Sequence, residues 1–508
     1  MTRPVVVVGG SVAGLATSLA LAGRGFRVRV LEQAPAPPEG PPDKAAELWE
    51  RPTVAQNGHS HILTSLGVRE LRAGAPEVLD AVLDAGGHLL DLMAALPERA
   101  DDRIRRPGDG ELVALAVRRP VFELVLRRIL RSLPNVTISQ QATVGGLLTA
   151  SSGARASSGA RALSGARDRV TRAAQVTGVV TVGGEHVPAL AVVDATGRRA
   201  ASRSWLSASG LPSPPELTAP TQVRGFTRFY RLKSPGALPG PLNRGNAAGG
   251  IWDHYAAVAH PADNGTYALT LGVPTADPAT NGLRDPAAFT AAARLSPFLA
   301  AWADPEAGEP IGPVRTITLP PNILRGAPPG AGARPVLGLF TVGDAACVTN
   351  PLFGRGMSLA LRHAFLLAEL LDAEPVVGER QAELAGHLAE GVYRPWYELS
   401  VREDAVRGRL WRSRVTGGTP PAATATATES GRPPLSAVAA AATTDGSVWR
   451  GFTRVLMGLD TAEEIFDDES FRERVLERVR AAPATAPDGP RPPSRAELLA
   501  AIGAEERV

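Results

Sequence analysis

The sequence has 508 residues, of which 44% are hydrophobic, so it is long enough for two or three lobes with a large buried core. Its formal net charge is only +3 and its basic residues are dispersed, which argues against a nucleic-acid-binding protein. Cys347 is the only cysteine and no run has the length of a membrane span, so we expect a cytoplasmic protein with no disulfide and no transmembrane segment.

The amino-terminal residues predict a βαβ unit. A buried strand is followed by a glycine turn, an apolar helix that ends near Gly23 or Gly25, and a second strand that ends at Glu32. The turn has the spacing of the dinucleotide-binding fingerprint, with serine in place of the middle glycine: Gly9-Gly10-Ser11-Val12-Ala13-Gly14. Glu32 is placed to accept hydrogen bonds from an adenosine ribose, which favours FAD or NAD over NADP.

Ser11 has a second interpretation, as a hydrolase nucleophile on a strand-to-helix elbow. That pattern requires a glycine two residues after the serine, where this sequence has Ala13. It also requires an earlier strand to supply an oxyanion loop, and none precedes this one. We therefore prefer the nucleotide-binding interpretation.

The middle of the chain predicts two further kinds of structure. Helical segments are expected up to about Leu96, and Pro120 opens an amphipathic helix. Strands are expected at 136–148 and 170–193, on either side of an insert at 151–168 that carries SGAR three times and is expected to be mobile. Alternating segments between 205 and 325 predict a separate antiparallel sheet that would bind the substrate.

A second glycine-rich loop follows the strand in "RPVLGLFTVGDAA". FAD has a ribityl chain and an isoalloxazine ring that one nucleotide-binding loop does not reach. Asp344 can accept a hydrogen bond from a ribityl hydroxyl, or can simply cap a turn. Gly354 and Gly356 precede an apolar helix, whose amino terminus suits the negative charge of reduced flavin. The second loop therefore favours FAD over a nicotinamide dinucleotide.

The whole chain predicts a mixed α/β fold. A Rossmann-like FAD-binding domain at 1–204 and 326–372 is interleaved with an antiparallel-sheet substrate domain at 205–325. Residues 373–508 are expected to form a helical C-terminal region with a low-complexity linker at 415–446. In that region Trp449, Phe452, Leu456 and Leu459 share one helical face, which we expect to pack against the body of the protein.

Three motifs together resemble a known family. "GGSVAGL" with Glu32, "VVDATGR" and "GDAACVTNPLFGRGM" occur in an order and spacing similar to those of the FAD-dependent monooxygenases of the p-hydroxybenzoate hydroxylase fold. "QNGHSHIL" and "RRPVFELVLRRIL" look more like one bacterial branch, which is similar to the squalene epoxidases and the polyether-polyketide epoxidases. The resemblance covers most of residues 1–372.

The resemblance implies a cofactor site that draws on both glycine-rich loops. Two positions depart from its pattern, because Ser11 replaces a glycine and Gly58 stands where the branch often has arginine. The implied contacts are Gly9, Ser11 and Gly14 to the pyrophosphate, Glu32 to the ribose, Arg119 to the phosphates or ribityl chain, Val144 to adenine, Asp344 to ribityl, and Pro351, Gly354 and Gly356 to the flavin ring, with Val12, Ala13, Gly343 and Met357 in the same site.

His59 and His61 are the candidate catalytic residues. They alternate, so in an extended chain they share a face and can reach a flavin or a substrate together. They can equally be capping or loop-packing residues. No third ligand lies near them in the sequence, so no metal site is predicted.

The resemblance implies that reduced FAD forms a C4a-hydroperoxide and transfers one oxygen atom to an organic substrate. The expected electron donor is NAD(P)H or a partner flavin reductase. No acid/base constellation appears between 205 and 325, which favours epoxidation or hydroxylation of a large apolar polyketide or terpenoid in natural-product biosynthesis.

A flavin-dependent double-bond reductase and a cyclase that uses FAD without net redox change remain alternatives. A flavin halogenase is disfavoured because Lys44 and Lys233 are poorly placed and "IWDHY" matches its motif poorly.

Overall fold

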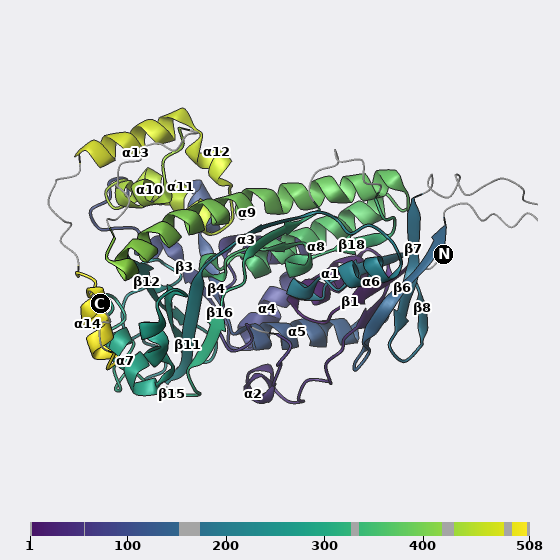
Figure 1. Ribbon diagram of the computed structural model, residues 1–508, viewed down its shortest axis with the longest axis horizontal. Coiled ribbons are helices and arrows are strands. Elements are labelled where there is room, and N and C mark those ends of the chain that lie inside the picture. The colour runs from purple at the N-terminus through teal and green to yellow at the C-terminus, as the bar shows by residue number, and fades with distance from the viewer. Residues whose placement is uncertain are drawn as a thin grey trace, which may run out of the picture.

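The computed structural model describes residues 3–54, 56–151, 173–326, 335–418, 431–481 and 490–504. The fold is mixed α/β, as predicted, with a parallel sheet, an antiparallel sheet and a helical C-terminal region (Figure 1). The SGAR repeats lie outside the described residues. Within the described part of the chain, no helix combines the length and the apolarity that a membrane span requires.

The parallel sheet forms the centre of the nucleotide-binding lobe. Its strand order is β18-β9-β1-β2-β5, and the strands are β1 Pro4–Val8, β2 Arg27–Leu31, β5 Val136–Ser139, β9 Ala191–Asp194 and β18 Leu339–Thr341. Val5 and Val7 pack on the side of the helices, and Val6 and Val8 pack on the opposite side. A continuous run of valines is therefore required here, because both faces of the sheet are covered.

Helices and a second small sheet cover these two faces. The helical layer contains α1 Val12–Gly23, α5 Arg119–Ser132 and α8 Gly356–Ala373. The opposite face packs against a three-stranded antiparallel sheet of β6 Val144–Ser151, β7 Ala174–Thr181 and β8 His186–Pro188. Both glycine-rich loops lie beside this parallel sheet, because each follows one of its strands.

The segment before α5 differs from the expectation of helices up to Leu96. It forms α2 Pro42–Leu48, α3 Ser65–Gly74 and α4 Pro76–Asp84, and then the strand β3 His88–Asp91. β3 pairs antiparallel with β4 Val113–Ala116, and Leu63 bridges to Leu115 on β4. The pairing partner lies more than twenty residues away in the sequence, so local periodicity did not reveal this strand.

The antiparallel sheet predicted between 205 and 325 is present. Its strand order is β12-β13-β14-β11-β15, with β16 also paired to β11; the bounds are β11 Val223–Leu232, β12 Ala248–Ile251, β13 Ala256–Pro261, β14 Thr266–Pro274, β15 Gly308–Pro310 and β16 Arg315–Thr318. One face packs on α7 Pro286–Leu295 and on α14 Arg495–Ala501, which returns from the end of the chain. The other face is turned towards the nucleotide-binding lobe.

Three remaining short strands and α6 complete the body of the protein. β10 Glu216–Ala219, β17 Asn322–Arg325 and β19 Cys347–Val348 form a small antiparallel sheet, and α6 spans Ser202–Ala208. The long helix α9 Glu379–Thr416 runs past α8, β17 and β14, so it contacts both lobes (Figure 1).

The rest of the C-terminal region is α10 Leu435–Ala442, α11 Gly446–Leu456, α12 Ala462–Phe466 and α13 Glu469–Ala481. α10 lies within the range expected to be a linker, and its alanine-rich sequence packs on α11 and α13. Trp449 and Leu459 are buried in the same core cluster as Trp396 of α9. The apolar face predicted around Trp449 therefore packs against the protein itself.

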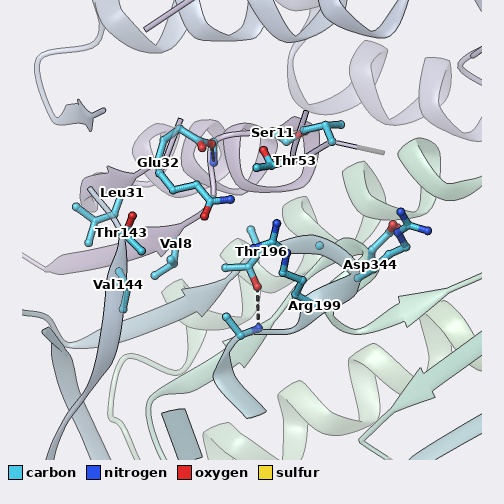
Figure 2. A pocket seen from close by; sticks show the side chains of 18 of the residues that line it. Val8, Ser11, Leu31, Glu32, Thr53, Thr143, Val144, Thr196, Arg199 and Asp344 are labelled. Atoms are coloured by element: carbon cyan, nitrogen blue, oxygen red, sulfur yellow. Dashed lines mark hydrogen bonds between the residues drawn. The ribbon is translucent and has the colours of Figure 1, made fainter. Parts of the chain in front are cut away.

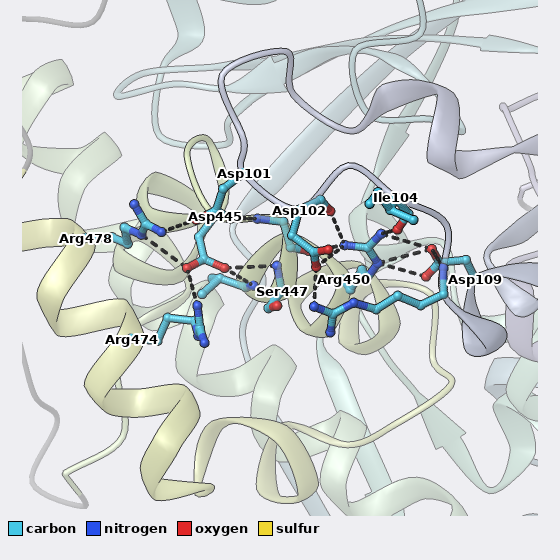
Figure 3. Close-up of polar contacts among 12 residues, drawn as sticks. Asp101, Asp102, Ile104, Asp109, Asp445, Ser447, Arg450, Arg474 and Arg478 are labelled. Carbon is cyan, nitrogen blue, oxygen red and sulfur yellow. Dashed lines mark hydrogen bonds and ion pairs between the residues drawn. The ribbon is translucent and has the colours of Figure 1, made fainter.

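Paired charges fasten α11 to the segment before β4 (Figure 3). The Arg450 guanidinium donates to a carboxylate oxygen of Asp109 at 2.9 Å and to the carbonyl of Ile104 at 2.8 Å. Asp445 caps the helix and accepts a hydrogen bond from Arg474 at 3.1 Å. These arginines and aspartates satisfy one another within the protein, so they need no ligand.

Candidate functional site

The first glycine-rich loop is held by close backbone packing. Gly9 has a φ of +110°, and a Cβ there would lie 2.4 Å from the carbonyl oxygen of Ala195. A Cβ on Gly14 would lie 1.9 Å from the carbonyl oxygen of Gly9. Only glycine fits at these two positions, which correspond to the first and third glycines of the fingerprint.

Ser11, the residue in place of the middle glycine, has a role of its own. It is the N-cap residue of α1, but its side chain makes no capping hydrogen bond. The Ser11 hydroxyl donates to Glu123 at 2.5 Å and accepts a hydrogen bond from Arg119 at 2.8 Å. The serine therefore ties the glycine-rich loop to α5.

Glu123 is the centre of a buried charge network beneath that loop. Its side chain is fully buried and accepts hydrogen bonds from Ser11, Arg119 and Arg51. Burial alone would raise the pKa of Glu123, but Arg51, Arg119 and the hydrogen bond from Ser11 hold the pKa below its usual value. Glu123 is therefore ionised and fixes two arginines in place.

Glu32 lies at the end of β2, as predicted. Its two carboxylate oxygens accept hydrogen bonds from the backbone N–H groups of Gly10 at 2.7 Å and Ala34 at 2.8 Å. The guanidinium groups of Arg51 and Arg127 lie 3.6 Å and 3.7 Å away. Each carboxylate oxygen keeps a second lone pair, so Glu32 can still accept further hydrogen bonds.

A cavity of about 230 Å³ joins these groups to the second loop. Figure 2 shows Val144 and Asp344 on opposite sides of it, with Glu32 and Ser11 along the wall between them. Of the predicted residues, the cavity brings together Gly9, Ser11, Glu32, Arg119, Val144 and Asp344. Lining residues that the sequence interpretation did not select include Arg51, Thr53, Gln56, Thr196, Arg198 and Trp205.

Asp344 faces this cavity with an unsatisfied carboxylate. It follows β18, and no described residue donates a hydrogen bond to its side chain; Arg325 donates only to its backbone carbonyl, at 2.8 Å. Burial raises the pKa of Asp344, and Arg119, Arg198 and Arg325 only partly oppose this rise. The carboxylate therefore needs hydrogen-bond donors from whatever fills the cavity.

The two glycine-rich loops meet at Gly343. This residue has a φ of +60°, and a Cβ on it would lie 2.7 Å from the Cβ of Ala13 in α1. Val12, Ala13 and Gly14 belong to the first turn of α1 and lie behind the cavity wall. The two loops, more than three hundred residues apart in the sequence, are therefore packed directly against each other.

The second loop continues away from the cavity lining. Pro351 begins a short 3-10 helix, Gly354 is left-handed with a φ of +68°, and Gly356 and Met357 begin α8. None of these four residues lines the cavity. A Cβ on Gly354 would lie 3.9 Å from Ile62, so the loop adjoins the segment that carries the two histidines.

Asp404 of α9 holds the second loop in place. It accepts hydrogen bonds from the side-chain amides of Asn322 at 2.7 Å and Asn350 at 2.8 Å. Asn350 caps the 3-10 helix that begins at Pro351. Asp404 also pairs with Arg407 in its own helix, but the two asparagines come from distant segments, so no local pattern predicts this contact.

His59 and His61 lie between the two lobes and do not line the cavity. The His59 Nδ1 lies 2.9 Å from the hydroxyl of Thr227 on β11, and the His61 Nδ1 lies 2.8 Å from the carbonyl oxygen of His59. Burial and Arg315 lower the pKa of His59 to about 4, and burial and Arg119 lower the pKa of His61 to about 3. Both imidazoles are therefore neutral near pH 7.

Two further observations concern the departure at Gly58 and the absence of a metal site in the part of the chain that the structure describes. Gly58, where the resembling branch often has arginine, packs against the side chain of Arg315, to which a Cβ would approach within 3.2 Å. Among the described residues, no group of three or more histidines, cysteines or carboxylates is arranged to hold a metal ion.

Comparison with known proteins identifies the fold. No protein-family model and no curated protein matches the sequence. Among solved structures, PqsL, a probable FAD-dependent monooxygenase from Pseudomonas aeruginosa, matches with a TM-score of 0.54 and 16% identity over 81% of this chain and 96% of PqsL. The flavin-dependent brominase Bmp2 matches with a TM-score of 0.52 and 15% identity over 95% of this chain and 100% of Bmp2. Over most of its length, the chain therefore has the fold of FAD-dependent monooxygenases.

Proposed function

We propose that the protein is an FAD-dependent monooxygenase that transfers one atom of molecular oxygen to a large, mainly apolar organic substrate. The observation that carries this proposal is that the first glycine-rich loop and Asp344 of the distant second loop line one cavity, where the two loops are in contact. The cavity is lined by a helix amino terminus, four arginines and two carboxylates, which supply the donors and acceptors that a flavin dinucleotide requires.

The residues along the cavity fit the parts of FAD in order. The backbone around Val144 would contact adenine, and the remaining lone pairs of Glu32 would accept the ribose hydroxyls. The amino terminus of α1, with Arg51 and Arg119, would bind the pyrophosphate. The unsatisfied carboxylate of Asp344 would accept hydrogen bonds from the ribityl chain, and this is the group that most requires such a ligand.

The second loop would hold the redox-active ring. Gly356 and Met357 begin α8, whose amino terminus favours negative charge, and Pro351 and Gly354 precede it. The flavin would supply the activation of oxygen, with electrons from NAD(P)H or a partner flavin reductase. The protein would supply position and exclusion of water.

The substrate would lie between the ring and the antiparallel sheet. The neutral imidazoles of His59 and His61 fit a positioning role better than a role in moving protons at neutral pH. This supports epoxidation or hydroxylation, in which burial and orientation of the substrate matter most, and a place in natural-product biosynthesis. PqsL has been crystallised in complex with 2-aminobenzoylacetate, which is consistent with an organic substrate.

Halogenation is less well supported by the residues present. Lys44 pairs with Asp43 at 3.7 Å and Lys233 with Glu306 at 3.8 Å, and neither lines the cavity. No lysine is therefore available beside the cavity to handle a hypohalous acid. A double-bond reductase and a redox-neutral cyclase would use the same cofactor site and differ only in the reaction.

The test has two stages. The purified protein should carry about one flavin per chain, and a colourless protein after incubation with FAD would contradict the proposal. The holoenzyme, supplied with reductant and oxygen, should then consume oxygen and add one oxygen atom to its substrate. A product that gains two hydrogens would identify a reductase, and turnover with the flavin oxidised throughout would identify a cyclase.

A further inference from the structure

The buried arginines of the protein differ in whether they have a counter-charge. Five of them each lie within 3.7 Å of a carboxylate oxygen: Arg51, Arg118, Arg127, Arg407 and Arg450. Arg355 is only 1% exposed, and it forms no ion pair with any residue that the structure describes. A buried cation is normally paired, because taking a charge out of water is costly. Arg355 is therefore an exception.

Arg355 lies inside the second glycine-rich loop. It stands between Gly354 and Gly356 and is the N-cap residue of α8, although its side chain makes no capping hydrogen bond. Its Cα is thus about 3.8 Å from the Cα of each glycine. A cation is disfavoured at this position as well as by burial, because a helix amino terminus already carries partial positive charge. An anion bound at the same turn would relieve both costs.

The guanidinium of Arg355 is turned towards α9. Its central carbon lies 4.5 Å from the ring centre of Phe353 and 4.8 Å from that of Trp396. The terminal nitrogen Nη2 donates to the hydroxyl of Ser400 at 3.3 Å, whereas Nε and Nη1 are buried and have no hydrogen-bond partner. Arg355 does not line the cofactor cavity. Its charge lies behind the loop, so it would act on a ligand of the loop through its field and not by contact.

The acidic groups of α9 compensate this charge only in part. Burial lowers the pKa of Arg355 to about 9, and Asp404 is the largest of the groups that oppose this shift. Asp404 is already bonded to Arg407 and to two asparagine amides. Burial raises the pKa of Glu403 to about 7, so near neutral pH this carboxyl is protonated in about half of the molecules. Arg355 therefore remains charged at pH 7.

We propose that Arg355 favours the reduced, negatively charged form of the flavin over the oxidised form, and so raises the redox potential of the bound cofactor. The N–H groups at the amino terminus of α8 favour negative charge, and the guanidinium adds to their field. This field is strong because water is excluded from the guanidinium. The proposal rests on the proposed function, since it requires a flavin ring at the second loop.

Packing alone is the other explanation for this side chain. The two aromatic contacts stabilise a buried guanidinium, whatever the loop binds. The two explanations differ in the effect of an uncharged side chain of similar length. A loss of packing would weaken the binding of oxidised and reduced FAD alike, whereas a loss of charge would weaken the binding of the reduced form selectively.

The first experiment measures the melting temperature of the FAD-free protein. Arg355→Met removes a buried charge that has no carboxylate partner, so the melting temperature should stay the same or rise. Arg118→Met leaves Asp263 buried without its partner and should lower the melting temperature. A fall for Arg355→Met as large as that for Arg118→Met would show that the charge serves the fold, and would overturn the proposal.

The second experiment measures the redox potential of FAD bound to the holoprotein, by anaerobic titration with dithionite beside a reference dye. Arg355→Met should reduce the preference for reduced over oxidised FAD about tenfold, which corresponds to a fall of about 30 mV in the two-electron potential. Arg355→Lys keeps the charge and should keep most of the potential. The matched control is Arg362→Met, which removes a partly exposed charge from the same helix and should change the potential little, because solvent screens that charge.

The outcomes separate this proposal from the proposed function. An unchanged potential in Arg355→Met, or an equal fall in Arg355→Met and Arg362→Met, would overturn the role of Arg355 and leave the flavoenzyme intact. Loss of FAD from both Arg355→Met and a second uncharged variant, Arg355→Gln, would also overturn it, because the residue would then hold both forms of the cofactor alike. Wild-type protein that stays colourless with FAD would reject both proposals together.

Discussion

The arginines of the cofactor cavity and Arg244 of the antiparallel-sheet lobe differ in how their charge is compensated. Arg51 and Arg119 are fixed by Glu123, so their positions are set before any ligand binds. Arg244 is only half-buried and has no such partner among the described residues, so solvent compensates its charge. A cation that is paired inside the protein is a preformed scaffold for a ligand, whereas a half-exposed cation is free to move and is worth little to stability.

This contrast bears on the cofactor cavity. There the protein completes most of its own charge network and leaves the carboxylate of Asp344 and the Nε of Arg51 without a hydrogen-bond partner among the described residues, which suits a cofactor that remains bound. The predictions below test each side of this comparison.

The largest effect is expected from Glu123→Ala, which leaves Arg119 without a counter-charge and leaves Arg51 with only Glu32, at 3.6 Å. Breaking a buried pair in this way should lower the free energy of unfolding by about 3–5 kcal/mol and weaken FAD binding. Denaturant unfolding and flavin titration measure the two losses. Asp372→Ala removes the half-exposed partner of Arg3 and should cost less than about 1 kcal/mol. Similar losses in the two variants would mean that Glu123 does not organise the site.

Asp344→Asn tests the one unsatisfied carboxylate of the cofactor cavity. The amide keeps the size of the side chain but accepts hydrogen bonds less strongly. A loss of about 1.5–3 kcal/mol of binding free energy should raise the dissociation constant of FAD about 10- to 100-fold. Quenching of flavin fluorescence measures it. The stability of the FAD-free protein should not fall, because no described residue donates to this carboxylate. The control is Asp304→Asn on an exposed turn, and a loss of FAD affinity there as well would remove the special role of Asp344.

The sequence predicted those parts of the fold and the site that depend on local spacing. Gly9, Gly14 and Glu32 follow from one βαβ unit, and Asp344 follows from the strand before the second loop. The Arg119–Glu123 pair, four residues apart on α5, was also readable as a helical ion pair. The sequence did not reveal that Glu123 also binds Arg51, because Arg51 comes from a distant segment.

The parts that could not be predicted depend on contacts between distant segments. β3 looked helical because its pairing partner β4 lies beyond a long loop, and α10 looked like a linker because its alanines gain stability only by packing. His260 shares a face of the antiparallel sheet with Ala268 only through the register of β13 on β14. The family resemblance predicted the fold, while the epoxidase branch and the domain bounds stay predictions.

The lowered pKa of His260 predicts how the stability of the protein depends on pH. An unfolded histidine binds a proton with a pKa of 6.5, whereas folded His260 remains neutral down to about 4. Between these values the unfolded state binds more protons, so stability should rise as pH rises from about 4 to 6.5, by at most about 1.4 kcal/mol per pH unit for this group. His260→Asn should reduce this slope in urea unfolding at a series of pH values. Arg244→Met should reduce it less, because burial remains; an unchanged slope in both variants would show that His260 is not held neutral.

The smallest effect is expected at Ser11, where two substitutions separate the hydroxyl from the Cβ. Ser11→Ala removes the hydrogen bonds to Glu123 and Arg119 and should cost about 1 kcal/mol of stability. Ser11→Gly removes the same bonds and also the Cβ that limits the approach of a pyrophosphate. FAD should therefore bind the glycine variant more tightly than the alanine variant, as flavin titration would measure. Equal FAD affinities would mean that the Cβ does not obstruct the cofactor, and that serine is tolerated here only because its hydroxyl completes the Glu123 network.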